Sequence, residues 1–200
     1  NRKSLNLHHG INITDEFMNC VKENSEFPLK SPKDGKILRK VNARELWQKI
    51  LETRIATGEP YLVFVDTVNR AMSSHQRENG LKVTTSNLCS EIMLHTGVDH
   101  KGKERTAVCC LSSVKLEKWN EWESDPKFIE DIMRFLDNVL DEFIKKAPNS
   151  MDNATYSAMR ERSVGLGAMG FHTFLQKNNI PFESSIAKSW NVKFFKHIRK

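Results

Sequence analysis

The chain has 200 residues, a formal net charge of +6 at pH 7, 38% hydrophobic residues and 28% charged residues. These values are typical of one globular domain or of a piece of a larger protein, and the apolar fraction is slightly low for a chain that covers its own core. No run of eighteen apolar residues and no signal peptide are found, which excludes a membrane-spanning helix and favours a cytoplasmic protein. Basic and acidic residues are interspersed, which favours a solvated surface over a nucleic-acid interface.

The first 114 residues predict a mixture of helices and strands. In chain order these are an extended segment at 5–13, a helix at 15–24, a hairpin or loop at 26–41, a helix at 42–58, a strand at 61–66, an extended stretch at 83–95 and a strand at 106–114. Thr14 and Asn42 are suited to cap the two helix starts. The apolar run at 61–66 indicates a strand buried on both faces of a parallel sheet. Polar residues at 67–80 predict a connection, and those at 97–104 predict a solvated loop.

The second half is predicted to be mostly helical. We expect helices from Asp125, from about residue 153 and from near Ser184, the second one broken around Gly165-x-Gly167-x-x-Gly170. These glycines have the spacing of a dinucleotide-binding turn, but helical sequence precedes them instead of a buried strand. Close helix packing is therefore the expected use of the glycines. The fold class is α/β with a helix-rich C-terminal half, and the strands are too few to close a barrel.

The cysteines show no metal-binding pattern. They are Cys20, Cys89, Cys109 and Cys110. No pair has the Cys-x-x-Cys spacing of a structural zinc site, and adjacent cysteines cannot bridge to each other without strain. His8 and His9 would point to opposite faces of a strand, so they predict no metal site either. We expect reduced thiols and no bound metal.

The stretch 83–95 carries side chains suited to bond-making chemistry. Asn87, Cys89 and Glu91 stand at i, i+2 and i+4, so in an extended segment they would form one row with about 6.5–7 Å between neighbours. The thiol can react, the carboxylate can accept a proton and the amide can hold a hydroxyl group. The alternative is a β-strand with an ordinary buried cysteine. Cys109 is in turn either a core residue or a second thiol facing the first, with Cys110 on the opposite face.

These residues and their flanks resemble one family. Asn87-Leu88-Cys89-Ser90-Glu91 is similar to the large (α, catalytic) subunit of class I ribonucleotide reductase, as are the segments 7–17, 58–69, 109–116 and 160–170. The resemblance runs over nearly the whole chain. It implies that residues 1–200 are a central part of a ten-stranded α/β barrel, without a separate second domain. Residues from about 83 to 95 would be a finger loop threaded through the barrel.

The resemblance also implies residue roles. Cys89 would carry a transient thiyl radical that removes hydrogen from C3′ of the ribose, Glu91 would take the 3′-hydroxyl proton, and Asn87 would hydrogen-bond the substrate hydroxyls. The substrate-binding residues would be Asn87, Leu88, Cys89, Ser90 and Glu91. Cys109, placed by the Cys-x-Leu-Ser match, would be one thiol of the redox pair that reduces the 2′ position. If the frame is off by one residue, Cys110 takes that role.

The implied activity is that of a ribonucleoside-diphosphate reductase, which makes deoxyribonucleotides for DNA synthesis. The chain would bind no cofactor, because a dimetal-containing small (β) subunit supplies the radical and thioredoxin or glutaredoxin supplies the reducing equivalents. The second redox cysteine, the nucleotide-effector domain and the radical-relay tyrosines of the family have no counterpart here. The remaining segments of the α subunit, itself a homodimer, would be required partners, and the isolated chain would be inactive. The alternatives are a non-catalytic assembly fragment and a thiol redox protein.

Overall fold

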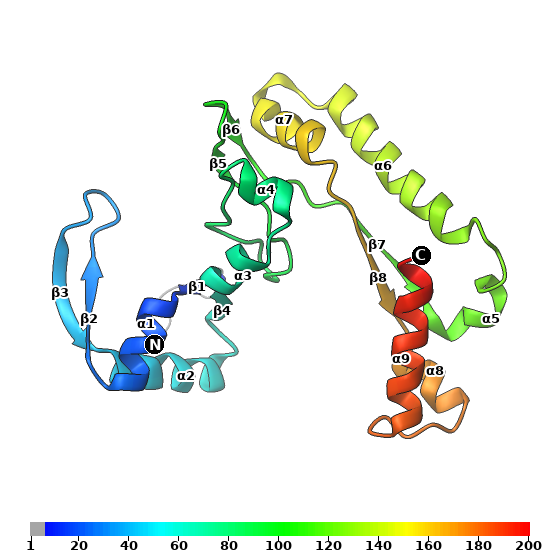
Figure 1. Ribbon diagram of the computed structural model, residues 1–200, viewed down its shortest axis with the longest axis horizontal. Helices are drawn as coiled ribbons and strands as arrows, with labels where there is room; N and C mark the ends of the chain where they lie inside the picture. The colour runs from blue at the N-terminus through cyan, green and yellow to red at the C-terminus, as the bar shows by residue number, and fades with distance from the viewer. Residues whose placement is uncertain (1–6) are drawn as a thin grey trace. The chain divides into compact units, whose positions relative to one another are not determined.

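Figure 1 shows the computed structural model, which describes residues 7–200. The chain forms two compact units, Asn1–Ala107 and Val108–Lys200. The first two residues of the extended segment expected at 5–13 lie outside the described part. Within residues 7–200, no helix is both long enough and apolar enough to cross a membrane.

The N-terminal unit alternates short strands and helices. Its elements are β1 (Gly10–Ile13), α1 (Asp15–Glu23), β2 (Glu26–Lys30), β3 (Ile37–Asn42), α2 (Ala43–Thr57), β4 (Tyr61–Phe64), α3 (Val65–Ala71), α4 (Ser74–Glu78), β5 (Gly97–Val98) and β6 (Glu104–Arg105). β1 and β4 are parallel, whereas β2–β3 and β5–β6 are antiparallel pairs. In Figure 1 the β2–β3 hairpin projects away from the helices α1 and α2.

Capping residues set the starts of α1 and α2 as the sequence predicts. The Thr14 hydroxyl accepts a hydrogen bond from the Phe17 N–H at 3.1 Å, and the Asn42 side chain accepts one from the Glu45 N–H at 3.0 Å. α2 ends at Gly58, which has a left-handed backbone with φ of 76°. The two helices then pack on β1 through a small core of Ile13, Phe17, Ala43 and Ile50.

Three expectations for this unit are wrong in part. The strand at 61–66 stops at Phe64, whose side chain is 46% exposed, because β4 pairs only with β1 in the described chain and the backbone turns helical at Val65. The polar connection at 67–80 contains most of α3 and all of α4. The solvated loop at 97–104 lies in the β5–β6 hairpin, where a buried ion pair joins Asp99 Oδ2 to Arg105 Nε at 2.9 Å.

The C-terminal unit is helix-rich, as expected, around one parallel pair of strands. Its elements are β7 (Leu111–Lys115), α5 (Trp119–Trp122), α6 (Phe128–Lys146), α7 (Asp152–Glu161), β8 (Gly165–Met169), α8 (Phe171–Lys177) and α9 (Ser185–Ile198), with 3₁₀ turns at Leu116–Lys118 and Asn149–Met151. The strand expected at 106–114 therefore begins only at Leu111. α6 begins at Phe128, three residues after the expected Asp125, and α9 begins where predicted, with Ser184 as its cap.

The glycine-rich segment forms a strand and does not pack between helices, which corrects the sequence prediction. β8 pairs in parallel with β7, with Gly165 opposite Leu111 and Gly167 opposite Ser113. A Cβ on Gly167 would lie 3.1 Å from the Ser113 Oγ, and one on Gly165 would lie 2.5 Å from a Leu111 methyl carbon. Because glycine has no side chain, these two positions leave room for the side chains of β7.

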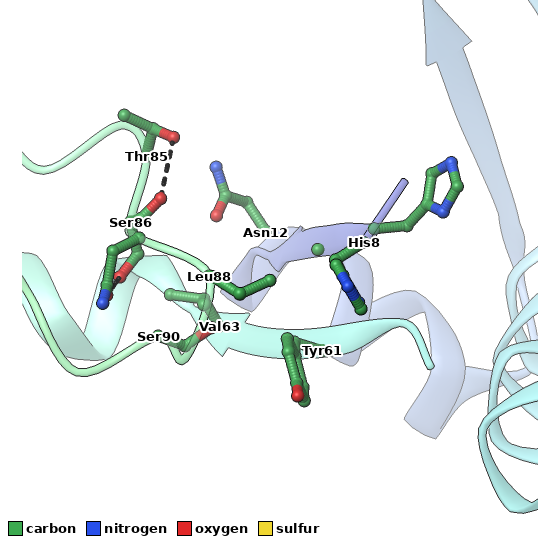
Figure 2. A pocket seen from close by; sticks show the side chains of 11 residues that line it. His8, Asn12, Tyr61, Val63, Thr85, Ser86, Leu88 and Ser90 are labelled. Atoms are coloured by element: carbon green, nitrogen blue, oxygen red, sulfur yellow. Dashed lines mark hydrogen bonds between the residues drawn. The ribbon is translucent and has the colours of Figure 1, made fainter. Parts of the chain in front are cut away.

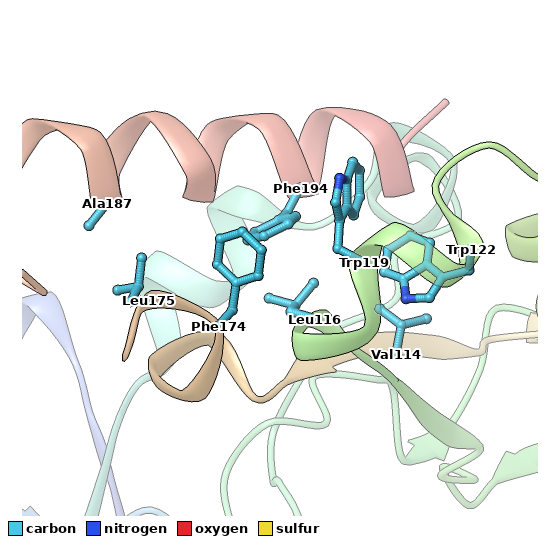
Figure 3. Packing of buried hydrophobic residues seen from close by; sticks show 8 residues of the cluster. All are labelled: Val114, Leu116, Trp119, Trp122, Phe174, Leu175, Ala187 and Phe194. Atoms are coloured by element: carbon cyan, nitrogen blue, oxygen red, sulfur yellow. The ribbon is translucent and has the colours of Figure 1, made fainter. Parts of the chain in front are cut away.

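The core of the C-terminal unit lies between the strand pair and α8 and α9. Figure 3 shows Phe174 and Phe194 facing each other from these two helices, with Leu116 and Trp119 beside them. The Phe174 and Phe194 rings meet edge to face, with centroids 4.9 Å apart. The buried residues of this core are Val114, Leu116, Trp119, Trp122, Phe174, Leu175, Ala187 and Phe194.

Arg162 joins α7 to α6. Its Nε donates to Asp137 Oδ1 at 2.9 Å and its Nη1 donates to Asp141 Oδ1 at 2.6 Å. Hydrogen bonding and charge from Arg162 hold the pKa of Asp141 below its ordinary value of 3.8. Because the folded pKa lies below the unfolded one, this contribution to stability is present at neutral pH and is lost as the pH falls below 3.8.

Replacing Arg162 with glutamine is expected to lower the melting temperature at pH 7 by about 2–6 °C, because it breaks bonds to two carboxylates. The difference from the wild type should shrink as the pH is lowered from 7 toward 3, because the lowered pKa of Asp141 makes this contribution to stability fall in acid. Circular-dichroism melts at both pH values measure this. Arg134→Gln is the matched control, because among the described residues Arg134 forms its ion pair with Glu130 of its own helix. Equal losses for both variants, or a difference independent of pH, would contradict the assigned role.

The described chain is thus a mixed α/β segment. Its strands form four two-stranded sheets, and within residues 7–200 they do not close a barrel. Two of the four pairs are parallel, β1–β4 and β7–β8. The first of these pairs supports the stretch that carries Cys89.

Candidate functional site

The stretch 83–95, called the Cys89 loop from here on, is not a strand. The row of alternating side chains expected for Asn87, Cys89 and Glu91 is therefore wrong as geometry. The chain makes a β-turn in which the Ser90 N–H donates to the Asn87 carbonyl at 3.1 Å, and Ser90 has a positive φ of 63°. Cys89 occupies the third position of this turn and is exposed to solvent, as is Glu91.

The side chain of Asn87 holds the turn closed. Its Oδ1 accepts from the backbone N–H of Glu91 at 3.1 Å and of Ile92 at 3.0 Å. Backbone N–H groups only donate, so the atom facing them must be the amide oxygen, and the Nδ2 group is turned away from them. Within residues 7–200, Nδ2 makes no hydrogen bond. A donor is therefore left available beside Cys89.

The outgoing arm of the loop is fixed to the rest of the unit by two asparagines that the sequence analysis did not single out. Asn69 of α3 accepts from the Val83 N–H at 2.8 Å and donates to the Val83 carbonyl at 3.0 Å, as a neighbouring strand would. Asn12 of β1 donates to the Thr84 carbonyl at 2.8 Å. Val83 is also 1% exposed and packs with Leu81. A lone Asn in a helix or strand carries no sequence signal for such bonds.

A polar cavity of about 280 Å³ lies between the Cys89 loop and the β1–β4 pair. Figure 2 shows Thr85 and Ser86 at one end of it and His8 at the other. It is lined by His8, His9, Gly10, Asn12, Tyr61, Val63, Thr85, Ser86, Asn87, Leu88 and Ser90. Three of the five predicted substrate-binding residues therefore line this cavity, and Cys89 and Glu91 do not.

The two histidines at the cavity share one carboxylate. Glu59 is 8% exposed, its Oε1 lies 2.5 Å from His8 Nδ1, and its Oε2 accepts from the His9 backbone N–H at 3.3 Å. His9 Nδ1 lies 3.8 Å from the same oxygen. The expectation that these rings point to opposite faces of a strand is wrong, because β1 begins only at Gly10. In the part of the chain that the structure describes, no three His, Cys, Asp or Glu side chains are grouped to hold a metal ion.

The adjacent cysteines of the C-terminal unit occupy different environments. Cys109 is exposed, whereas Cys110 is 8% exposed and its thiol lies 3.5 Å from the Leu136 carbonyl. Burial raises the pKa of the Cys110 thiol, and the neighbouring Cys109 adds to this effect. A protonated, buried thiol is a poor nucleophile, so Cys109 is the better placed of the two for redox chemistry.

Comparison with known proteins identifies the family. The model of the ribonucleotide reductase barrel domain matches residues 1–200. A ribonucleoside-diphosphate reductase large subunit of Frog virus 3 (isolate Goorha) is 51% identical over 190 residues, which cover 94% of this chain and 33% of the relative. The large subunit of Invertebrate iridescent virus 3 is 42% identical over 174 residues, which cover 87% of this chain and 27% of the relative.

A solved structure agrees with these relatives. The class Id ribonucleotide reductase alpha subunit of Actinobacillus ureae matches with a TM-score of 0.78 and 34% identity, over 96% of this chain and 33% of that protein. The chain spans about a third or less of the length of these three proteins. The match of the family model over every residue, together with this likeness in sequence and fold, shows that the chain belongs to the ribonucleotide reductase family as a segment of the large-subunit barrel domain.

Proposed function

We propose that this chain is the part of a ribonucleoside-diphosphate reductase large subunit that carries the radical-bearing thiol and the catalytic base. The observation that carries the proposal is the β-turn closed by Asn87, which presents an exposed thiol at Cys89 and an exposed carboxylate at Glu91 within two residues of each other. Thiol, carboxylate and amide are the groups that hydrogen-atom abstraction and proton removal on one sugar require.

In the proposed reaction Cys89 acts as a thiyl radical. Its sulfur takes the hydrogen atom from C3′ of the ribose, so an S–H bond forms as the C3′–H bond breaks. Glu91 accepts the 3′-hydroxyl proton, and the 2′-hydroxyl takes a proton from one thiol of the redox pair as the C2′–O bond breaks, so that it leaves as water. The same hydrogen returns from Cys89 to C3′ at the end, which restores the thiyl radical. The net electrons come from two further thiols, which become a disulfide.

Cys109 is the proposed donor thiol on this chain. Reduction of one ribose consumes two electrons and two protons, which two thiols release when they form a disulfide, so Cys109 needs a partner cysteine. That partner belongs to the remaining segments of the large subunit. Thioredoxin or glutaredoxin then reduces the disulfide. The exposure of Cys109 suits exchange with a second thiol, whereas the burial of Cys110 does not.

Asn87 and its neighbours form the proposed substrate contact. The amide oxygen of Asn87 is engaged by the backbone of Glu91 and Ile92, which leaves Nδ2 to donate to a ribose hydroxyl. Leu88 and Ser90 line the cavity next to it. The substrate class is a ribonucleoside diphosphate.

The rest of the machinery lies in partner segments and subunits. We propose that β1–β4 and β7–β8 are parallel pairs of a ten-stranded α/β barrel, which the remaining large-subunit segments complete around the Cys89 loop as a finger loop. Exposed apolar side chains support this, among them Phe135 of α6 and Phe195 of α9, which are 65% and 47% exposed. The small subunit supplies the radical to Cys89, and the complete large subunit pairs as a homodimer.

The test of the base is Glu91→Gln in the reductase assembled with its other segments and its small subunit. Loss of a general base is expected to lower kcat by about 10²–10⁴-fold, with substrate binding largely retained, because glutamine keeps the size but cannot take the proton. Glu78→Gln on α4 is the matched control, because Glu78 is an exposed carboxylate of the same unit with no part in the reaction. Turnover unchanged by Glu91→Gln would remove Glu91 from the mechanism.

A further inference from the structure

His95 lies at the base of the Cys89 loop and is buried, with 7% of its surface exposed. Its Nδ1 lies 3.1 Å from the Lys82 backbone nitrogen and 2.8 Å from the Lys82 carbonyl oxygen. Its Nε2 lies 3.2 Å from the Val98 carbonyl oxygen. One imidazole thus contacts the residue that precedes the loop and the hairpin strand that follows it.

Within the described residues the Cys89 loop is not part of a β-sheet, so no strand-to-strand hydrogen bonds hold its two arms. The contacts of His95 hold the base of the loop instead. With its proton on Nε2 the ring would donate to the Val98 carbonyl and accept from the Lys82 N–H, and with its proton on Nδ1 it would donate to the Lys82 carbonyl, so in either tautomer Nδ1 has a backbone partner in Lys82. Both ends of a fourteen-residue span, from 82 to 95, are thereby held together at one point. Because loop closure costs chain entropy, fixing the base reduces the number of positions that the turn can occupy.

The two arms of the loop are held differently. The outgoing arm is fixed by Asn69 and Asn12, which bond residues 83 and 84. The returning arm bonds to the outgoing arm near the turn, where Ser86 Oγ donates to the Ile92 carbonyl at 2.8 Å. Asn87 Oδ1 accepts from the backbone N–H groups of Glu91 and Ile92 beside it. Met93 adds apolar packing, which sets no direction. His95 is the side chain that directs the returning arm at its base.

We infer that His95 is a positioning residue for the reactive turn, an inference that rests on the proposed function. It does not touch substrate. It fixes the position and orientation of the returning arm that bears Glu91. The carboxylate and the Cys89 thiol thereby keep the relative placement that the reaction needs. A shift of about 1 Å at a reacting group can cost about a hundredfold in rate.

Two substitutions separate hydrogen bonding from packing. His95→Leu keeps a similar volume without hydrogen-bonding groups. His95→Asn restores an amide that can accept from the N–H and donate to the carbonyl of Lys82, as Asn69 does with Val83. His100→Leu is the matched control, because His100 is exposed in the turn of the β5–β6 hairpin.

The assembled reductase carrying each variant is examined by steady-state kinetics and by hydrogen exchange of the peptide that contains residues 82–95. We expect His95→Leu to lower kcat about 10–100-fold with KM changed less than about threefold. Its loop amides should exchange about tenfold faster. His95→Asn should recover most of both losses, and His100→Leu should behave as the wild type.

The outcomes distinguish this inference from the proposed function. Unchanged loop exchange and unchanged kcat in His95→Leu would overturn the positioning role. Failure of His95→Asn to recover either quantity would do the same, because the role assigned is hydrogen bonding to Lys82. If the wild-type assembly reduces no ribonucleotide, the proposed function fails, and the exchange measurements still decide whether His95 orders the loop.

Discussion

Replacing Cys89 with serine is expected to lower ribonucleotide reduction by the assembled reductase about a thousandfold or more, because the reacting atom itself is lost. An O–H bond is stronger than an S–H bond, so a serine hydroxyl cannot form and re-form the radical at a useful rate. The substitution should not disturb the fold. Cys89 is exposed at the third position of the β-turn, and serine suits a turn at least as well.

The measurement compares turnover of a ribonucleoside diphosphate with equilibrium binding of the same nucleotide to wild type and Cys89→Ser. Binding should stay within a few-fold while turnover disappears. Cys20→Ser is the control, because Cys20 is a partly buried thiol of α1 that packs against the core of the same unit. Turnover retained in Cys89→Ser would exclude the radical role and leave a non-catalytic part in the assembly, or a thiol exchange function, as the explanation of the sequence.

Local rules predicted the helix ends because the atoms involved are close in sequence. Thr14, Asn42 and Ser184 each accept a hydrogen bond from an N–H three residues later. The residues that determine where each helix starts therefore lie within one turn of it. The segment 26–41, expected to be a hairpin or a loop, forms the β2–β3 hairpin for the same reason. Its turn residues at 31–35 and the strands on either side are neighbours in sequence.

Elements that depend on a distant partner were not predictable in this way. β8 is rich in glycine, which has low strand propensity, and it exists because β7, more than fifty residues earlier, pairs with it. Asp99 lies in the segment 97–104, which the sequence predicts to be a solvated loop, but it is buried in an ion pair with Arg105 for a related reason. A charged residue in a short polar segment is usually exposed, and only the folded unit buries Asp99 with its partner.

The candidate site was found by residue type and misjudged in shape. Spacing at i, i+2 and i+4 predicted a row in a strand, yet Asn87 is also a favoured first residue of a β-turn, and its side chain can bond to amides further along the chain. The structure uses this second property. The contributions of Asn12, Asn69 and His95 carry no sequence signature, because each depends on contacts between segments that fold together.

Replacing Cys109 and Cys110 with serine one at a time should distinguish the thiol that takes part in redox chemistry from the thiol that packs in the core. Cys109→Ser is expected to lower the rate of multiple turnover with thioredoxin or glutaredoxin by about a hundredfold or more, because no disulfide can form. Cys110→Ser should keep turnover within a few-fold. It should instead lower the free energy of unfolding by about 1–2 kcal/mol, since a hydroxyl replaces a thiol that is buried against Leu136.

Thiol labelling supplies an independent measurement. The raised pKa and burial of Cys110 predict slow reaction with a maleimide at pH 7, whereas the exposed Cys109 should react quickly. Labelling of Cys109 is measured in Cys110→Ser, and labelling of Cys110 is measured in Cys109→Ser. Mass spectrometry of the labelled peptide then gives the reaction rate of each thiol separately. If Cys110→Ser abolished turnover and Cys109→Ser did not, the alignment would be off by one residue. The redox thiol would then have to leave the core formed with Leu136 and Leu140 during the reaction.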